Sequence, residues 1–227
     1  LMQDGIGQIT RLAGASSLGP TEAAQLANQI QKYVVENTRL GIPALIHEEC
    51  CSGYMARNAT CFPQTIGVAC TWEPQLARAM ADVVRQQMRA AGAHQGLSPL
   101  LDVTRDPRWG RTEETYGEDP YLTARLGIRY IKGLQGHDAH YLKSAACVKH
   151  FAAYGAPQAG RDYNTVDMSD RSLFEWYLPP YKAAVDAGVG SVMSSFNEIA
   201  GVPSTSNRWL LTDLLRGKWG FNGFVVS

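Results

Sequence analysis

Short apolar runs alternate with longer amphipathic segments along this chain. The runs have the length of buried strands, and the segments repeat apolar residues at helical spacing. The sequence therefore predicts strands at residues 44–49, 97–103, 144–151, 189–196 and 223–227, and helices at residues 21–39, 71–91, 120–134, 169–187 and 206–218. The adjacent prolines Pro179 and Pro180 are expected to break or kink the fourth helix, because proline cannot continue a helical hydrogen-bond ladder.

Each predicted strand ends in polar residues on its C-terminal side. The endings are Glu48-Glu49, Asp102, Lys149-His150, Ser194-Ser195 and Ser227. In a (β/α) barrel such ends share the face that carries the active site. The pattern therefore favours an α/β fold, a (β/α)8 TIM-like barrel truncated before its last strand or strands. No Gly-x-Gly-x-x-Gly follows a strand, which argues against a doubly wound dinucleotide-binding sheet.

Charge and hydrophobicity narrow the range of partners. The 227 residues are 45% hydrophobic, enough for a substantial core, and 21 Lys+Arg balance 21 Asp+Glu. Without net charge the sequence gives no indication of electrostatic binding to nucleic acid or to an anionic membrane surface. No apolar run approaches the roughly 20 residues that a membrane-spanning helix needs. Uncharged or weakly charged ligands are expected. The first residue is not Met and Ser227 ends an apolar run, so both ends are expected to continue in a longer polypeptide.

The cysteines predict free thiols and no metal centre. They are Cys50, Cys51, Cys61, Cys70 and Cys147, an odd number that lacks the paired spacing of zinc ligands. The first two are adjacent and would close only a strained ring, which argues against a redox pair. Free thiols, together with the lack of an export signal, slightly favour the cytoplasm.

A polar loop at residues 102–119 follows the second predicted strand. It combines acids, arginines and aromatic residues between glycines and prolines, which suits a polar ligand. Arg111 follows Trp109-Gly110, and its planar guanidinium is expected beside that aromatic ring, reaching vicinal hydroxyls or a carboxylate. The alternative is a loop that is only rigidified by ion pairs of Arg105, Arg108 and Arg111 with Asp106, Glu113 and Glu114.

Two charged pairs stand at strand ends. Adjacent residues of a regular strand point to opposite faces, so only one of Lys149 and His150 is expected to project into a barrel unless the strand ends there. Lys149 suits either a Schiff base or a buried cation paired with a barrel carboxylate. Glu48 and Glu49 cannot both flank one bond, so at least one is expected to bind ligand and the other to be structural.

A series of motifs runs through nearly the whole chain. They are Gly41-Ile-Pro, His47-Glu-Glu, Phe62-Pro-Gln, Arg105-Asp-Pro-Arg-Trp-Gly-Arg111, Tyr116-Gly-Glu-Asp-Pro120, Lys149-His-Phe151, Gly201-Val-Pro203 and Trp219-Gly-Phe-x-Gly-Phe-Val-Val-Ser227. With these motifs the chain resembles family 3 of the glycoside hydrolases. The resemblance implies a retaining, exo-acting β-glycosidase. It also implies that residues 1–227 are an N-terminal (β/α) barrel domain, incomplete at its C-terminus, which an α/β sandwich domain follows.

The resemblance implies roles for single residues as well. Glu49, Arg111, Lys149 and His150 would bind the non-reducing terminal sugar, with Arg161 at a loosely matching distance and Phe196 where many members carry a tyrosine beside the nucleophile. The nucleophile would be an Asp directly after Ser227, and the acid/base would lie in the following domain. Residues 1–227 alone are therefore expected not to hydrolyse glycosides. No metal or organic cofactor is implied, because two carboxylates and water suffice.

The preferred sugar is expected to depend on Glu49. Many glucosidases of the family have Asp there, and a side chain one methylene longer would intrude on the hydroxymethyl group of a hexose. We expect β-D-xylosides to be preferred over β-D-glucosides, with glucosidase side activity, since one methylene is worth about 1–3 kcal/mol. The branch that releases N-acetylglucosamine is not expected, because Ala152-Ala153-Tyr154 follows the Lys-His-Phe motif and no histidine follows His150.

Two other classes of protein fit parts of the pattern. A non-catalytic sugar-binding protein would keep the pocket and lack an Asp after Ser227. A Schiff-base lyase would use Lys149 and form a reducible adduct with a carbonyl substrate. The expected partners of the glycosidase are an oligosaccharide or small glycoside and the following sandwich domain. A homo-oligomer is compatible with the sequence, which does not indicate one.

Overall fold

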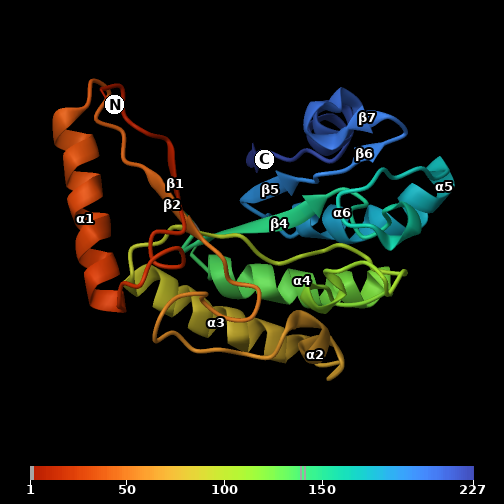
Figure 1. The fold of residues 1–227 in the computed structure, drawn as a ribbon, viewed down its shortest axis with the longest axis horizontal. Coiled ribbons are helices and arrows are strands. Elements are labelled where there is room, and N and C mark those ends of the chain that lie inside the picture. The colour runs from red at the N-terminus through yellow and green to blue at the C-terminus, as the bar shows by residue number, and fades with distance from the viewer. Residues whose placement is uncertain (1–2, 139, 141) are drawn as a thin grey trace.

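A parallel sheet organises the structure (Figure 1). The computed structural model describes residues 3–138, 140 and 142–227. Within these residues the strands β1(Gln8–Thr10), β2(Leu45–Glu48), β3(Gln95–Gly96), β4(Ala145–Phe151), β5(Ser191–Ser194) and β8(Phe224–Val226) pair in that order, and every pair is parallel. A parallel sheet whose spatial order follows the chain is the sheet of a (β/α) barrel. The predicted α/β barrel-type fold is therefore confirmed.

Helices return the chain between strands. They are α1(Pro20–Asn37), α2(Thr65–Ala69), α3(Pro74–Ala90), α4(Pro120–Gln135), α5(Asp170–Ser172) and α6(Pro179–Asp186), with π-helical segments at Leu173–Tyr177 and Trp209–Lys218. Helices α3 and α4 lie side by side below the sheet in the view of Figure 1. They approach closely at Gly133, where an added Cβ would come within 2.5 Å of the Cβ of Ala81. Buried apolar side chains such as Met88, Leu134 and Val148 fill the space between helices and sheet.

Several segments differ from the sequence prediction. The strand expected at residues 97–103 is not formed: β3 lies just before this range, which stays buried and is joined to β4 by the isolated bridge of Leu100 with Lys149 and by the Leu101 N–H, which donates to the Lys149 carbonyl at 2.7 Å. Pro99 accounts for the interruption, because proline donates no ladder hydrogen bond. Strand β1 and the small hairpin of β6(Glu198–Ile199) and β7(Val202–Pro203) are absent from the prediction, since such short strands leave no recognisable apolar run.

Other expectations can be compared directly with the structure. The break at the two prolines is confirmed, because a π-helical segment ends at Tyr177 and α6 begins at Pro179. All five cysteines are free thiols. In the described ranges no helix combines the length and apolarity needed to cross a membrane. Within the same ranges no three His, Cys, Asp or Glu side chains are grouped so as to hold a metal ion.

A partly buried histidine makes the fold sensitive to acid. His94 precedes β3, and its Nδ1 accepts the backbone N–H of Ile46 at 3.1 Å, so this nitrogen must stay unprotonated. Burial, assisted by Arg89, lowers the pKa of His94 below the ordinary value for histidine. The unfolded chain therefore takes up the proton at a higher pH than the folded chain. This contribution to stability is complete above about pH 6.5 and is lost as the pH falls below it.

We expect the Tm of the full-length protein to fall between about pH 7 and about pH 5, and to fall less in the His94→Gln variant. The glutamine amide oxygen can accept the same N–H and does not titrate. Scanning calorimetry of both proteins at the two pH values measures the difference. Equal falls in Tm would contradict the role of His94.

Candidate functional site

Polar side chains converge on a cavity at the C-terminal ends of the strands. The cavity has a volume of about 550 Å³, within the range of small-molecule sites. It is lined by Glu49, Arg111, Lys149, His150, Met193, Ser194, Ser195, Phe196, Thr205 and Ser227. Five of the residues singled out in the sequence are thus brought together. Arg161 is not, because it is exposed and does not belong to this lining.

A second hollow has a similar volume, about 560 Å³, and lies beside α2 and the start of α4. Its charged residues Arg105, Glu118 and Asp119 are all exposed. The first cavity instead holds Lys149 and His150, which are 2% and 1% exposed. Buried ionisable groups with convergent partners mark functional sites, so we place the site in the first cavity.

Lys149 is a buried cation paired with a carboxylate. Its Nζ lies 2.9 and 3.2 Å from the two oxygens of Glu49, which follows β2. Burial lowers the pKa of Lys149, but neighbouring Cys51 and the Glu49 carboxylate raise it, and the net pKa lies above the ordinary value. The ammonium form therefore persists at neutral pH, which disfavours the Schiff-base alternative. The Glu49 side chain is 28% exposed, so its carboxylate can also accept hydrogen bonds from a ligand.

Lys149 and His150 both line the cavity, although they are adjacent in β4. The alternation of a regular strand therefore does not hold here, one residue before β4 ends at Phe151, which is the exception allowed for a strand end. The pairing of β4 with β5 shifts register between Val148 and Phe151. An irregularity of this kind redirects side chains from the alternation of a regular strand.

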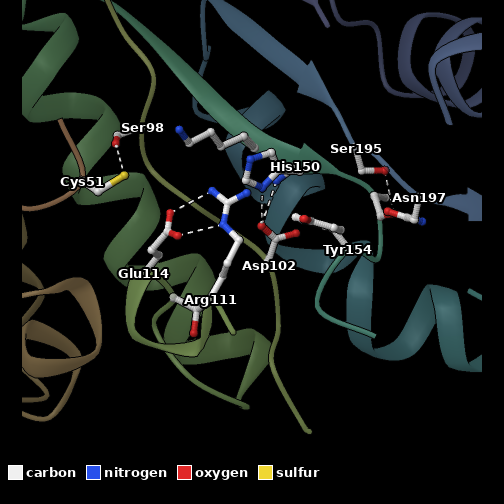
Figure 2. A network of polar contacts seen from close by, with 12 residues as sticks. Cys51, Ser98, Asp102, Arg111, Glu114, His150, Tyr154, Ser195 and Asn197 are labelled. Carbon is white, nitrogen blue, oxygen red and sulfur yellow. Dashed lines mark hydrogen bonds and ion pairs between the residues drawn. The ribbon is translucent and has the colours of Figure 1, made fainter. Parts of the chain in front are cut away.

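Asp102 fixes the imidazole of His150 (Figure 2). Asp102 Oδ2 accepts the His150 backbone N–H at 3.0 Å and lies 2.9 Å from His150 Nδ1, while the Tyr181 hydroxyl donates to Asp102 Oδ1 at 3.1 Å. Burial lowers the pKa of His150 below the ordinary value, and Asp102 offsets this shift only in part. The Asp102 carboxylate can only accept, so Nδ1 of the neutral ring donates to it and Nε2 is left as a hydrogen-bond acceptor on a residue that lines the cavity.

Arg111 is both an ion-pair partner and a cavity residue. Its Nε and Nη2 donate to the two oxygens of Glu114 at 2.8 and 2.9 Å (Figure 2). The aromatic ring beside its guanidinium is that of Tyr154, 5.5 Å away, and not the expected Trp109. Arg108 pairs with Asp106, so the ion-pair alternative holds for two of the three arginines of the loop.

Glu48 has a structural role. It is 1% exposed, and its carboxylate accepts the backbone N–H groups of Ala13 at 2.7 Å and Gly14 at 3.1 Å. An added Cβ at Gly14 would lie 2.7 Å from Glu48 Oε2, so glycine permits this close approach. Of the two adjacent acids, Glu49 therefore faces the cavity and Glu48 holds the segment after β1.

Replacing Glu48 by alanine in the full-length protein should lower the free energy of unfolding by about 2–4 kcal/mol, because two buried N–H groups lose their acceptor. The kcat/KM of the folded protein should change little. Urea unfolding measures the first quantity, and Glu36→Ala, at an exposed helical position, is the control. A Glu48→Ala protein as stable as that control would contradict the structural role.

The ring of Phe196 lines the cavity and packs against other aromatic rings. The Phe196 ring is 56% exposed and lies 5.5 Å from His150, 5.3 Å from Tyr154 and 5.1 Å from Tyr163, measured between ring centroids. The sequence did not indicate Tyr154 or Tyr163 as site residues. Both follow β4, and neither carries a charge or belongs to a metal-ligand pattern that could have identified it. The sequence likewise did not indicate Asp162, which bonds Tyr154 and stands beside the exposed Arg161.

A parallel α/β sheet with a polar cavity at its strand ends defines a barrel-type enzyme domain. The chain belongs to glycosyl hydrolase family 3, since the profile of the glycosyl hydrolase family 3 N terminal domain matches residues 1–227. A periplasmic β-glucosidase of Salmonella typhimurium is 42% identical over 208 residues, which are 91% of this chain and 27% of that protein. A β-xylosidase of Formosa agariphila is 45% identical over 201 residues, 84% of this chain and 28% of that protein.

Solved structures agree with this assignment. A β-glucosidase of Erythrobacter marinus has a TM-score of 0.95 at 39% identity, covering 99% of this chain and 30% of that one. A mutant β-glucosidase of Listeria innocua in complex with laminaribiose has a TM-score of 0.87 at 42% identity, covering 97% and 29%. The chain therefore spans less than a third of the length of these relatives.

Proposed function

We propose that the full-length protein is a retaining, exo-acting β-glycosidase that releases terminal β-D-xylosyl or β-D-glucosyl residues from oligosaccharides or glycosides. The observation that carries this proposal is the convergence of Glu49, Arg111, Lys149 and His150 on one cavity in a family 3 domain. Relatives named β-glucosidase and β-xylosidase support both sugars. The cytoplasmic location stays a prediction, and one relative is named periplasmic.

The cavity offers complementary partners for a sugar. The Lys149 ammonium and the Arg111 guanidinium donate hydrogen bonds, whereas the Glu49 carboxylate and His150 Nε2 accept them. Each sugar hydroxyl both donates and accepts, so vicinal hydroxyls can be held from two sides. These bonds accelerate hydrolysis to the extent that they tighten as the ring flattens toward an oxocarbenium ion.

The nucleophile is proposed to be an Asp directly after Ser227. Ser227 lines the cavity, so the next residue of the full-length protein can reach the anomeric carbon of a bound sugar. The Asp would displace the leaving group, whose oxygen receives a proton from an acid in the following sandwich domain. Water, deprotonated by the same group, would then release the sugar from the ester with overall retention.

A trapping experiment tests this mechanism. The full-length protein is incubated with 2-deoxy-2-fluoro-β-xylosyl and -glucosyl fluorides, which form a glycosyl ester faster than they hydrolyse it. We expect peptide mass spectrometry to find one fluoroglycosyl residue on the residue after Ser227. Sugar binding without any adduct would favour a non-catalytic binding protein. An adduct on Lys149 after borohydride treatment with a carbonyl compound would favour a lyase.

A further inference from the structure

One buried tyrosine supports three residues of the cavity wall. The guanidinium carbon of Arg111 lies 5.5 Å from the centroid of the Tyr154 ring. The rings of His150 and Phe196 meet the same ring edge-on at centroid distances of 5.1 and 5.3 Å. Tyr154 is fully buried and does not itself line the cavity. Its ring therefore lies behind two polar residues and one aromatic residue that line the cavity.

The tyrosine hydroxyl is anchored from behind by Asp162. Oδ1 of Asp162 accepts hydrogen bonds from the Tyr154 hydroxyl and, at 2.9 Å, from Nε1 of Trp109. Trp109 is 1% exposed, and its ring meets the Tyr154 ring edge-on at 5.1 Å. One carboxylate oxygen thus holds both buried rings. The orientation of the Tyr154 ring is therefore determined by Asp162, which does not line the cavity.

The consequence for Arg111 follows from its two supports. Glu114 holds the guanidinium through two hydrogen bonds, and Tyr154 limits its position on the side of the ring face. If the Tyr154 ring turned, the Arg111 guanidinium and the His150 ring would both lose their contact with it. A displacement of about 1 Å in a ligand-holding group can cost about 100-fold in rate.

We propose that Tyr154 and Asp162 are positioning residues, which hold Arg111 and His150 in the geometry that binds the terminal sugar. The kinetic part of this proposal rests on the proposed glycosidase function. Neither residue needs to touch the sugar. The loop after β4 therefore contributes to the site through Asp162, and not through its neighbour Arg161.

The test uses four variants of the full-length protein: Asp162→Ala, Asp162→Asn, Tyr154→Phe and the control Asp167→Ala, at an exposed position of the same loop. We measure kcat and KM on aryl β-xyloside and β-glucoside, Kd for D-xylose and D-glucose by calorimetry, and Tm. Asp162→Ala and Tyr154→Phe are expected to lower kcat/KM about 10- to 100-fold. Asp162→Asn should retain most of it, because the amide oxygen accepts both hydrogen bonds. Asp167→Ala should match the wild type.

A double-mutant cycle separates positioning from a merely structural role. If Asp162 acts through Arg111, Asp162→Ala should cost only about 3-fold or less in an Arg111→Lys background, because coupled residues are not additive. Full additivity, or a fall in Tm with unchanged kcat/KM and Kd, would overturn the proposal. Tyr154→Phe gives the same answer if Asp162→Ala does not fold.

The two proposals fail in different ways. A wild-type protein that binds xylose or glucose without turnover would refute the proposed glycosidase function. In that case, a Kd about 10-fold higher in Asp162→Ala would still support the positioning role. A wild type that hydrolyses glycosides with unchanged kinetics in Asp162→Ala and Tyr154→Phe would refute positioning alone. A wild type that neither binds nor hydrolyses would refute both.

Discussion

Replacing Lys149 by methionine in the full-length protein is expected to lower kcat/KM on aryl glycosides about 100- to 1000-fold, the usual loss for one donor aimed at a transition state. The Lys149 side chain is 3% exposed, so its ammonium is paired with Glu49 and not with bulk water, and in the proposed function it also donates to the bound sugar. Methionine fills similar space and donates nothing. Because Glu49 keeps partial contact with solvent, its unpaired carboxylate should not prevent folding.

The matched control is Lys182→Met. Lys182 lies in α6 and pairs with Asp186 at the surface, where ion pairs contribute about 0–1 kcal/mol. Its kcat/KM should equal that of the wild type. A Lys149→Met enzyme within about 3-fold of the control would mean that this ammonium does not hold the sugar.

The second large effect concerns the choice of sugar. Glu49→Asp withdraws the carboxylate by one methylene and, in the proposed binding mode, makes room for the hydroxymethyl group of a hexose. It also lengthens the ion pair with Lys149, so both substrates should lose some rate. We expect the ratio of kcat/KM for xyloside to that for glucoside to shift about 10- to 200-fold toward the glucoside.

The ratio is the decisive quantity, because general damage to the site would reduce both rates together. Glu175→Asp, at a position where the acid pairs with Arg171 at the surface, is the control and should leave the ratio unchanged. An unchanged ratio in Glu49→Asp would show that Glu49 does not exclude the hydroxymethyl group, whichever sugar the wild type prefers.

The strands that could be predicted are those with continuous apolar runs, as in β4 and β5. The segment around Pro99 could not, because its burial resembles a strand while proline interrupts the ladder. Lys149 and His150 could be located by their place at a strand end. That both face the cavity depends on a register shift, which the alternation of strand residues does not encode.

In the loops, too, single residues could be predicted from the sequence but their contacts could not. Arg111 is visible in the sequence as a charged residue in a Gly/Pro-rich loop, but its aromatic partner is Tyr154, from the loop after β4, and not the nearby Trp109. Proximity in sequence misleads here, because Trp109 turns its ring into the core and bonds Asp162. Pairings between distant loops arise only from tertiary packing.

The most direct test of the account is kcat/KM of the full-length protein on aryl β-D-xyloside and aryl β-D-glucoside, measured side by side with the Lys149→Met variant. We expect hydrolysis of both substrates, a preference for the xyloside, and loss of both activities in the variant. A glucoside preference would keep the mechanism and contradict the role of Glu49. Hydrolysis of neither substrate, or hydrolysis undiminished in the variant, would contradict the central claim that this cavity binds the sugar of a β-glycosidase.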